Sequence, residues 1–173
     1  PLYTEEDGKR ALRAFTPVAF GRDIQLDKHL TLRFSPSGHI LGSAFVLIKD
    51  ASTSILFSGD IGRPKELIMP APEKITGADY LVLESTYGDR CHAHLPQVPQ
   101  RTPVDARTVR CDVLCGAHRQ QRGRIHADYQ EILDWLSHFK KPPRATYITH
   151  GEPSASDALR HRIEKSKRWR CTV

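Results

Sequence analysis

Short apolar runs in the first half of the chain have the length and composition of β-strands. They are rich in β-branched and aromatic residues, as strands usually are, and lie at Leu30–Phe34, Ser43–Ile48, Thr53–Ser58 and Asp79–Ser85. The second and third runs are separated by Asp50-Ala51-Ser52, a turn-forming sequence that predicts a hairpin. The fourth run is almost continuously apolar, which predicts a strand buried on both faces.

Three other segments carry helical signals. Their apolar residues recur at helical spacing or follow a capping sequence, and we expect helices at Thr4–Phe15, His126–Phe139 and Ser154–Lys167. In the first helix, Thr4 and Asp7 have the spacing of a capping box. Between the last two helices, Ala145–Glu152 has the pattern of a further strand that ends in His and Gly. Strands that give way to alternating helices and strands predict an α/β, or layered α+β, fold with helices packed on a mixed sheet.

The middle of the chain differs from both flanks. Residues 91–124 hold three prolines, three of the four cysteines and few aliphatic residues. We therefore expect residues 91–124 to form an irregular linker between residues 1–90 and residues 125–173.

Composition narrows the range of partners. The chain is 39% hydrophobic and 27% charged and carries a formal net charge of +6, which permits an anionic partner such as nucleic acid. No apolar run approaches the roughly 18 residues of a membrane helix, and the first residues lack the pattern of a signal peptide. We therefore expect a cytoplasmic protein with no membrane partner and with reduced cysteines.

Three predicted strands or strand-edge loops end in metal-ligand residue types beside glycine. These are His39 in "PSGHILG", Asp60 in "FSGDIGR" and His150 in "YITHGE". Histidine and aspartate side chains at one edge of a sheet can hold a zinc ion. Each residue alone is equally compatible with a hydrogen-bonded turn, but the pattern occurs three times.

A second pair of residues has the chemistry of an acid–base couple. Glu84 ends the strand in "LVLEST", and His126 opens the predicted helix in "HADYQEIL". A carboxylate that orients a histidine fixes its tautomer and raises its basicity. The alternatives are a solvated Glu84 and a His126 that caps the helix.

These residues occur in segments that resemble the β-CASP branch of the metallo-β-lactamase superfamily, which includes RNA-processing exonucleases and endonucleases. The segments stand in the family's order: "PLYTEEDGKRAL", "FSPSGHILGSAFV", "FSGDIGRP", "LESTYGDR", "HADYQEILDWL" and "THGEP". The resemblance implies a partial αββα sandwich, with residues 1–90 as the later part of the metallo-β-lactamase-like domain and 125–173 as its closing helix, strand and helix. It also implies RNA as the substrate and zinc as the cofactor.

The resemblance assigns roles to individual residues. His39 and His150 correspond to zinc ligands, and Asp60 corresponds to the carboxylate that bridges two zinc ions in intact relatives. Glu84 and His126 correspond to the acid–base pair of the branch. Either His92 or His94 corresponds to a histidine that follows the "TYGDR" segment.

The chain departs from the family pattern in two respects. It has no His-x-His-x-Asp-His motif, and residues 91–124 stand where the family inserts a large domain. We therefore expect a partial zinc site that holds one ion and an RNA phosphodiester hydrolase of reduced activity. The alternatives are a non-catalytic RNA-binding remnant with at most one weak zinc site, and a structural module whose sheet is completed by another chain or a second copy.

Two further groups of residues remain open. Cations around the last predicted helix are candidates for RNA phosphate contacts, with Trp169 as a stacking partner, or they form an ordinary solvated helix face; they include Arg162, Lys165, Lys167 and Arg168. Cys111 and Cys115, with His118, Cys91 and His92, contain enough ligand types for a separate zinc site. Their spacing is not the tight Cys-x-x-Cys pairing of zinc ribbons, so an irregular segment with free thiols is the preferred interpretation.

Overall fold

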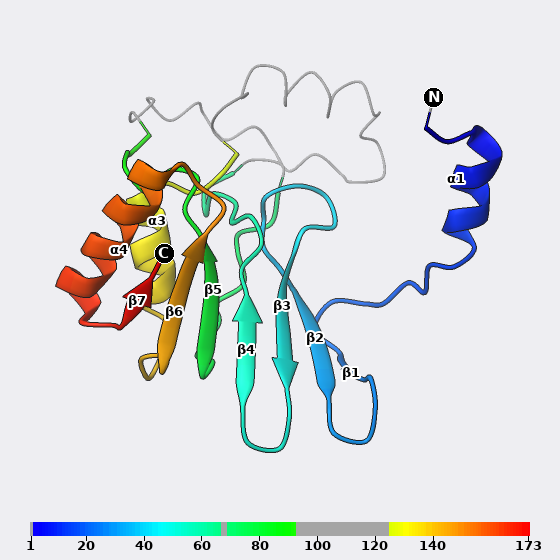
Figure 1. Ribbon diagram of the computed structural model, residues 1–173, viewed down its shortest axis with the longest axis horizontal. Helices are drawn as coiled ribbons and strands as arrows, with labels where there is room; N and C mark the ends of the chain where they lie inside the picture. The colour runs from blue at the N-terminus through cyan, green and yellow to red at the C-terminus, as the bar shows by residue number, and fades with distance from the viewer. Residues whose placement is uncertain (1, 67–68, 93–124) are drawn as a thin grey trace.

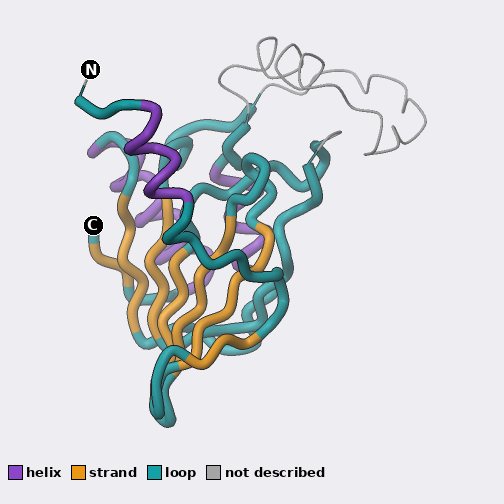
Figure 2. The backbone as a smooth tube through the Cα atoms, turned by 90° about the vertical axis from the view of Figure 1, so that its right-hand side faces the viewer, coloured by secondary structure: helices purple, strands orange, loops and turns teal. Residues whose placement is uncertain are grey.

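Seven strands in sequence order form one mixed sheet in the computed structural model, which describes residues 2–66, 69–92 and 125–173 (Figure 1). The strands are β1 (Asp23–Gln25), β2 (Thr31–Pro36), β3 (Ala44–Lys49), β4 (Ser54–Phe57), β5 (Tyr80–Glu84), β6 (Ala145–Thr149) and β7 (Cys171–Thr172). They run side by side, and loops gather at both ends of the sheet (Figure 2).

The sheet changes from antiparallel to parallel at β4. Strands β1 to β4 pair antiparallel, and β4 to β7 pair parallel. The predicted hairpin between β3 and β4 is confirmed, because the Asp50 side chain accepts hydrogen bonds from the backbone N–H groups of Ser52 and Thr53, both at 2.7 Å. The parallel strands are joined by longer connections, two of which contain helices.

The three predicted helices are present as α1 (Glu5–Leu12), α3 (Tyr129–Leu136) and α4 (Pro153–Lys167). The capping box of Thr4 and Asp7 is formed as expected. Helix α3 begins three residues later than predicted, because Asp128 rather than His126 is its N-cap and pairs with Glu131 in a second capping box. The proposal that His126 caps this helix is therefore wrong.

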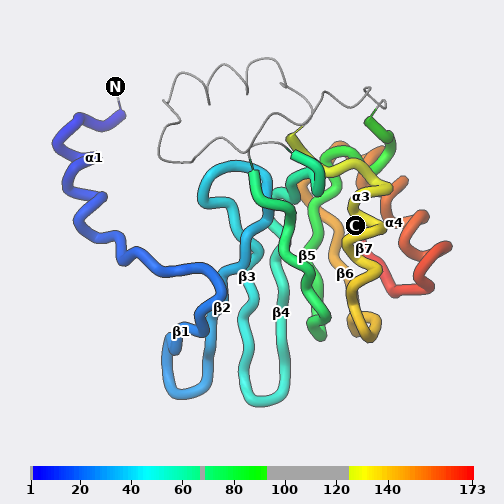
Figure 3. The backbone as a smooth tube through the Cα atoms, turned by 180° about the vertical axis from the view of Figure 1, so that it is seen from behind, coloured from blue at the N-terminus to red at the C-terminus, as the bar shows by residue number. Residues whose placement is uncertain are grey.

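One face of the sheet forms the core. The side chains of Leu56, Leu81 and Ile148 point to this face and are buried under α3 and α4. The helices contribute the buried residues Ile132, Trp135, Leu136, Leu159 and Ile163. Helix α1 lies beyond the opposite edge of the sheet from α4 and has no buried residue (Figure 3).

The other face is only partly covered by the described residues. Phe57 and Tyr147 point to it and are 38% and 46% exposed. In β5, Leu81 and Leu83 are buried but Tyr80 and Val82 are half-buried, so burial on both faces was an overestimate. No helix among the described residues is long and apolar enough to cross a membrane.

Two short strands were not predicted, and most of the predicted linker lies outside the described residues. Strands β1 and β7 were not predicted, because their three and two residues are too short to show a period. Of the predicted linker at 91–124, all but the first two residues lie outside the described part of the chain.

Two neighbouring residues of β4 test this division of the sheet. Leu56→Ala should lower the free energy of unfolding by about 2–5 kcal/mol, because Leu56 is fully buried against the helices. Phe57→Ala, its matched control, should cost about half of that or less, since its ring keeps contact with water. Urea denaturation of both variants measures the difference, and equal losses would contradict the one-sided core.

Candidate metal and acid–base centre

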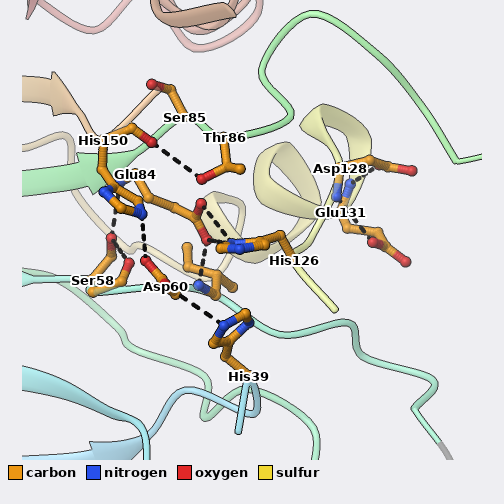
Figure 4. Close-up of polar contacts among 12 residues, drawn as sticks. His39, Ser58, Asp60, Glu84, Ser85, Thr86, His126, Asp128, Glu131 and His150 are labelled. Carbon is orange, nitrogen blue, oxygen red and sulfur yellow. Dashed lines mark hydrogen bonds and ion pairs between the residues drawn. The ribbon is translucent and has the colours of Figure 1, made fainter. Parts of the chain in front are cut away.

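The candidate side chains meet at one end of the sheet because of strand direction. Strands β4, β5 and β6 are parallel, so Asp60, Glu84 and His150, at or just beyond their carboxyl ends, share one edge. Strand β2 runs in the same direction as β4, since each is antiparallel to β3, and it brings His39 to that edge. Figure 4 shows these residues facing a common centre.

Asp60 lies between two imidazoles. Its Oδ2 is 3.4 Å from Nε2 of His39, and its Oδ1 is 3.1 Å from Nε2 of His150 (Figure 4). The two histidines therefore face different oxygens of one carboxylate. The three residues identified from the sequence as metal ligands do meet at one place.

His126, expected as the acid–base partner of Glu84, also lies within metal-ligand distance of His39 and Asp60, which the sequence did not predict. One ligand atom each from His39, Asp60 and His126 lies within 4.8 Å of the other two. Within the described residues, His150 is not part of this mutually close set and approaches through Asp60 instead. The mutually close group is thus His39, Asp60 and His126, with His150 in contact with Asp60, and the assignment of His39, Asp60 and His150 as the metal ligands stays a prediction.

Glu84 and His126 form the expected pair. The Nδ1 of His126 donates to Oε2 of Glu84 at 3.2 Å. Glu84 is 2% exposed, which contradicts the alternative of a solvated carboxylate, and it also accepts the backbone N–H of Ile61. Its own backbone N–H donates to the hydroxyl of Ser58 at 3.0 Å.

The pKa values of the neighbouring His39 and His126 are shifted in opposite directions. Burial lowers the pKa of His126, but its hydrogen bond and charge interaction with Glu84, aided by Asp60, outweigh burial, so the pKa of His126 is raised. The pKa of His39 is lowered by burial and by His126, against the opposing charges of Asp60 and Glu84. Their ring centroids are only 4.2 Å apart, so one imidazole holds a proton more readily than the other.

A close contact between two glycines brings the His39 and Asp60 loops together. A Cβ atom on Gly62 would lie 2.0 Å from the carbonyl oxygen of Gly38, a distance that no side chain tolerates. The N–H of Gly62 donates to the carbonyl of Ser37 at 2.8 Å. Glycine at position 62 therefore allows the loop of His39 to pack against the turn that carries Asp60.

Ser85 and Thr86 hold the backbone around His150, a function that the sequence did not reveal. His150 has a φ of 55°, which is uncommon for a residue with a side chain. The Thr86 hydroxyl donates to the carbonyl of His150 at 3.1 Å, and the Ser85 hydroxyl donates to that of Thr149 at 2.9 Å. These bonds fix the turn that directs His150 toward Asp60.

His92 supports the backbone of His126. Its Nε2 donates to the carbonyl of His126 at 2.9 Å, and its backbone N–H donates to Asp128 at 2.9 Å. His92, Asp128 and Glu131 also lie close enough to hold an ion. Their polar atoms are already used, however: Asp128 caps α3, and Glu131 pairs with Arg63 at 3.0 Å. We interpret this group as structural; His94 lies outside the described residues.

The basic residues near α4 are less free than their charge suggests. The guanidinium of Arg162 lies 3.6 Å from the ring centroid of Tyr129, and Trp169 is 8% exposed and packs on Phe139. The suggestion that Trp169 stacks on a base is therefore wrong. Lys165 and Arg168 are exposed, and Lys167 is half-buried.

The separate cysteine-based zinc site lies largely outside the described residues. Cys111, Cys115 and His118 fall there. Within the described part, Cys91 is an exposed free thiol and Cys171 is a half-buried one.

Replacement of Glu84 tests the origin of the His126 shift. In Glu84→Gln the pKa of His126 should fall below its ordinary value of about 6.5, because burial remains while the carboxylate charge is lost. The raised pKa in the parent adds stability below about pH 6.5, which is lost as pH rises through the raised value. That added stability should disappear in the variant.

NMR titration of the imidazole resonances and urea denaturation across pH 5 to 8 measure both effects. His29, in the β1–β2 turn, provides an internal control within each titration. An unchanged His126 titration in Glu84→Gln would contradict the assignment of the shift to Glu84.

Known proteins resemble this chain in sequence over about half its length. Residues 125–173 match the family model of the Zn-dependent metallo-hydrolase RNA specificity domain. Ribonuclease TTHA0252 of Thermus thermophilus is 36% identical over 92 residues, which cover 53% of this chain and 21% of the relative. Endoribonuclease YSH1 of Gibberella zeae is 35% identical over 101 residues, which cover 53% of this chain and 11% of the relative. Transcription termination factor FttA of Pyrococcus abyssi is 37% identical over 102 residues, which cover 56% of this chain and 15% of the relative.

Solved structures agree on the fold. The metallo-β-lactamase fold protein YhfI of Bacillus subtilis superposes with a TM-score of 0.57 at 14% identity, covering 96% of this chain and 58% of that one. A metal-dependent hydrolase of Parabacteroides distasonis superposes with a TM-score of 0.55 at 9% identity, covering 97% of this chain and 61% of that one. The chain thus spans between 11% and 21% of the length of the curated relatives described above. The matched domain at residues 125–173, the related nucleases and the shared metallo-β-lactamase fold all agree with the resemblance of the chain to the β-CASP branch.

Proposed function

We propose that this chain contributes one side of a zinc-dependent centre that hydrolyses RNA phosphodiester bonds. The observation that carries the proposal is the position of Asp60, whose two oxygens face His39 and His150 separately. A carboxylate arranged in this way could share a zinc ion with either histidine. The adjacent Glu84–His126 pair adds a proton donor at the same edge of the sheet.

The donor set suits zinc in chemistry and in spacing. Imidazole nitrogens and carboxylate oxygens are common zinc ligands, at about 2.0–2.2 Å from the ion, so two ligands at a tetrahedral angle lie about 3.3–3.5 Å apart. The Asp60–His39 separation of 3.4 Å has this value and exceeds a usual N–H···O bond. When bound, zinc supplies an activated water and neutralises charge on the phosphate.

The remaining residues act on the proton and on the orientation of the ligands. Glu84 holds His126 through Nδ1, which leaves Nε2 to protonate the departing oxygen of the RNA. Such assistance is worth about 10²- to 10⁴-fold in rate. The hydrogen bonds from the hydroxyls of Ser85 and Thr86 keep His150 directed at Asp60.

RNA is the substrate class that the comparisons support. The matched family model describes an RNA specificity domain, and two of the relatives are named as ribonucleases. The net charge of +6 is compatible with a phosphate-rich ligand.

A second candidate function is RNA binding without catalysis. It is favoured by the small number of metal ligands that the described residues bring to the centre. Two histidines that share one carboxylate, with His126 engaged by Glu84, offer too few ligands for two tightly held ions. We therefore expect this chain alone to bind zinc weakly and to have little ribonuclease activity.

Metal titration tests the centre directly. Calorimetry with Zn²⁺, and the absorption spectrum with Co²⁺, should detect at most one weakly bound ion in the parent chain. Asp60→Asn should weaken binding by about tenfold or more, because it removes the shared negative charge and one donor oxygen. Asp157→Asn, an exposed control on α4, should leave the affinity unchanged.

Two outcomes would contradict this part of the proposal. Equal affinities in Asp60→Asn and the parent would place the ion elsewhere. Two tightly bound zinc ions per chain in an elemental assay would mean that further ligands exist.

Activity assays distinguish the two candidate functions. Single-stranded RNA incubated with the chain and Zn²⁺ or Mn²⁺ should be cleaved slowly or not at all, because acid–base assistance cannot replace a missing metal-activated nucleophile. Robust cleavage by the parent that is lost in His126→Ala would show that this chain is a competent nuclease. Cleavage that survives in His126→Ala would identify a contaminating nuclease and leave the expectation intact.

A further inference from the structure

A cleft lies at the end of the sheet opposite the candidate centre. It has a volume of about 680 Å³ and is bounded by the β3–β4 turn and by the loops that precede β5 and β6. These loops lead into the amino ends of the parallel strands, whereas Asp60, Glu84 and His150 lie at or beyond the carboxyl ends. Strand β5 alone, five residues long, separates the two ends by roughly 15 Å.

The acidic groups of the cleft are used within the protein. Asp50 accepts hydrogen bonds from the backbone of the β3–β4 turn, and these bonds lower its pKa. Asp79 accepts from the side chain and backbone of Ser54 at 2.8 and 2.9 Å and lies 3.3 Å from Arg144. Both carboxylates therefore have their hydrogen-bonding capacity largely committed.

The lysines of the cleft, in contrast, have no such partners. Lys49, Lys140 and Lys141 line the cleft and are exposed, and none of them has an ion pair with a described residue. On α4, Arg160 is paired with Asp157 and Glu164 and Arg162 lies over the ring of Tyr129, whereas Lys165 and Lys167 also lack an ion pair with a described residue. The cleft thus gathers three uncommitted positive charges in one concave surface.

We propose that this cleft is a second RNA contact site, at which Lys49, Lys140 and Lys141 bind backbone phosphates away from the candidate centre. The inference rests on RNA as the ligand class of the proposed function, but not on metal binding or catalysis. Lysine ammonium groups without internal partners release counterions when they meet phosphates, which supplies affinity without base specificity. An RNA that reaches both ends of the sheet would be held at the cleft while another part meets the centre.

The salt dependence of binding gives a quantitative test. Fluorescence anisotropy with a labelled single-stranded oligouridine, in EDTA and between 50 and 200 mM KCl, measures the affinity of the whole 173-residue chain. For single strands the slope of log K against log[salt] is about −0.7 for each phosphate contact. The triple variant Lys49→Gln, Lys140→Gln, Lys141→Gln should bind more weakly and lose about 2 from the magnitude of that slope.

A matched variant separates this site from the basic tail. Lys165→Gln, Lys167→Gln, Arg168→Gln removes the same charge from the end of α4 and should change the slope by less than the cleft variant. If both variants lost the same amount from the salt slope, the effect would depend on net charge alone, and the proposal would be overturned. An unchanged slope in the cleft variant, or no RNA binding by the parent, would overturn it as well.

Two further measurements keep the outcomes distinct. The binding assay is run in EDTA and measures no cleavage, so a failure of the metal and catalytic proposal leaves this result in place. Displacement of the RNA by micromolar inorganic pyrophosphate would identify a small-anion site and contradict the proposal. Thermal unfolding should be similar for both triple variants, since the substituted side chains are exposed except for the half-buried Lys167.

Discussion

The buried carboxylate of Glu84 is the constraint on which the centre depends. A charge removed from water is costly unless other groups pair with it and donate hydrogen bonds to it. Glu84 meets that requirement through the N–H of Ile61 and the imidazole of His126. Its position therefore ties together the end of β5, the turn that carries Asp60, and the segment before α3, which are distant in sequence but adjacent at one edge of the sheet.

Strand direction explains why most of this edge could be predicted from the sequence. Apolar runs that end in His, Asp or Glu beside glycine place those side chains at strand ends, and parallel strands bring their carboxyl ends together. The positions of His39, Asp60, Glu84 and His150 follow from that rule.

The contacts that refine the centre follow from packing between loops, which no local pattern reveals. His126 was expected to begin a helix, but Asp128 is the better N-cap because its side chain accepts two backbone N–H groups. His126 therefore precedes the helix and lies beside Glu84. Its ring is close enough to His39 and Asp60 to bind a metal ion together with them. The hydroxyls of Ser85 and Thr86 likewise act on a loop more than sixty residues away.

The two adjacent histidines acquire different chemistry from their positions relative to Glu84. His126 donates directly to the carboxylate, which favours its protonated form, whereas His39 is buried against His126 and favours the neutral form. A neutral imidazole offers a lone pair to a metal without first losing a proton, and a protonated one can deliver a proton to a leaving group. Two identical side chains, with ring centroids 4.2 Å apart, can thus divide ligand and acid functions between them. The division requires only that one buried carboxylate face one ring and not the other.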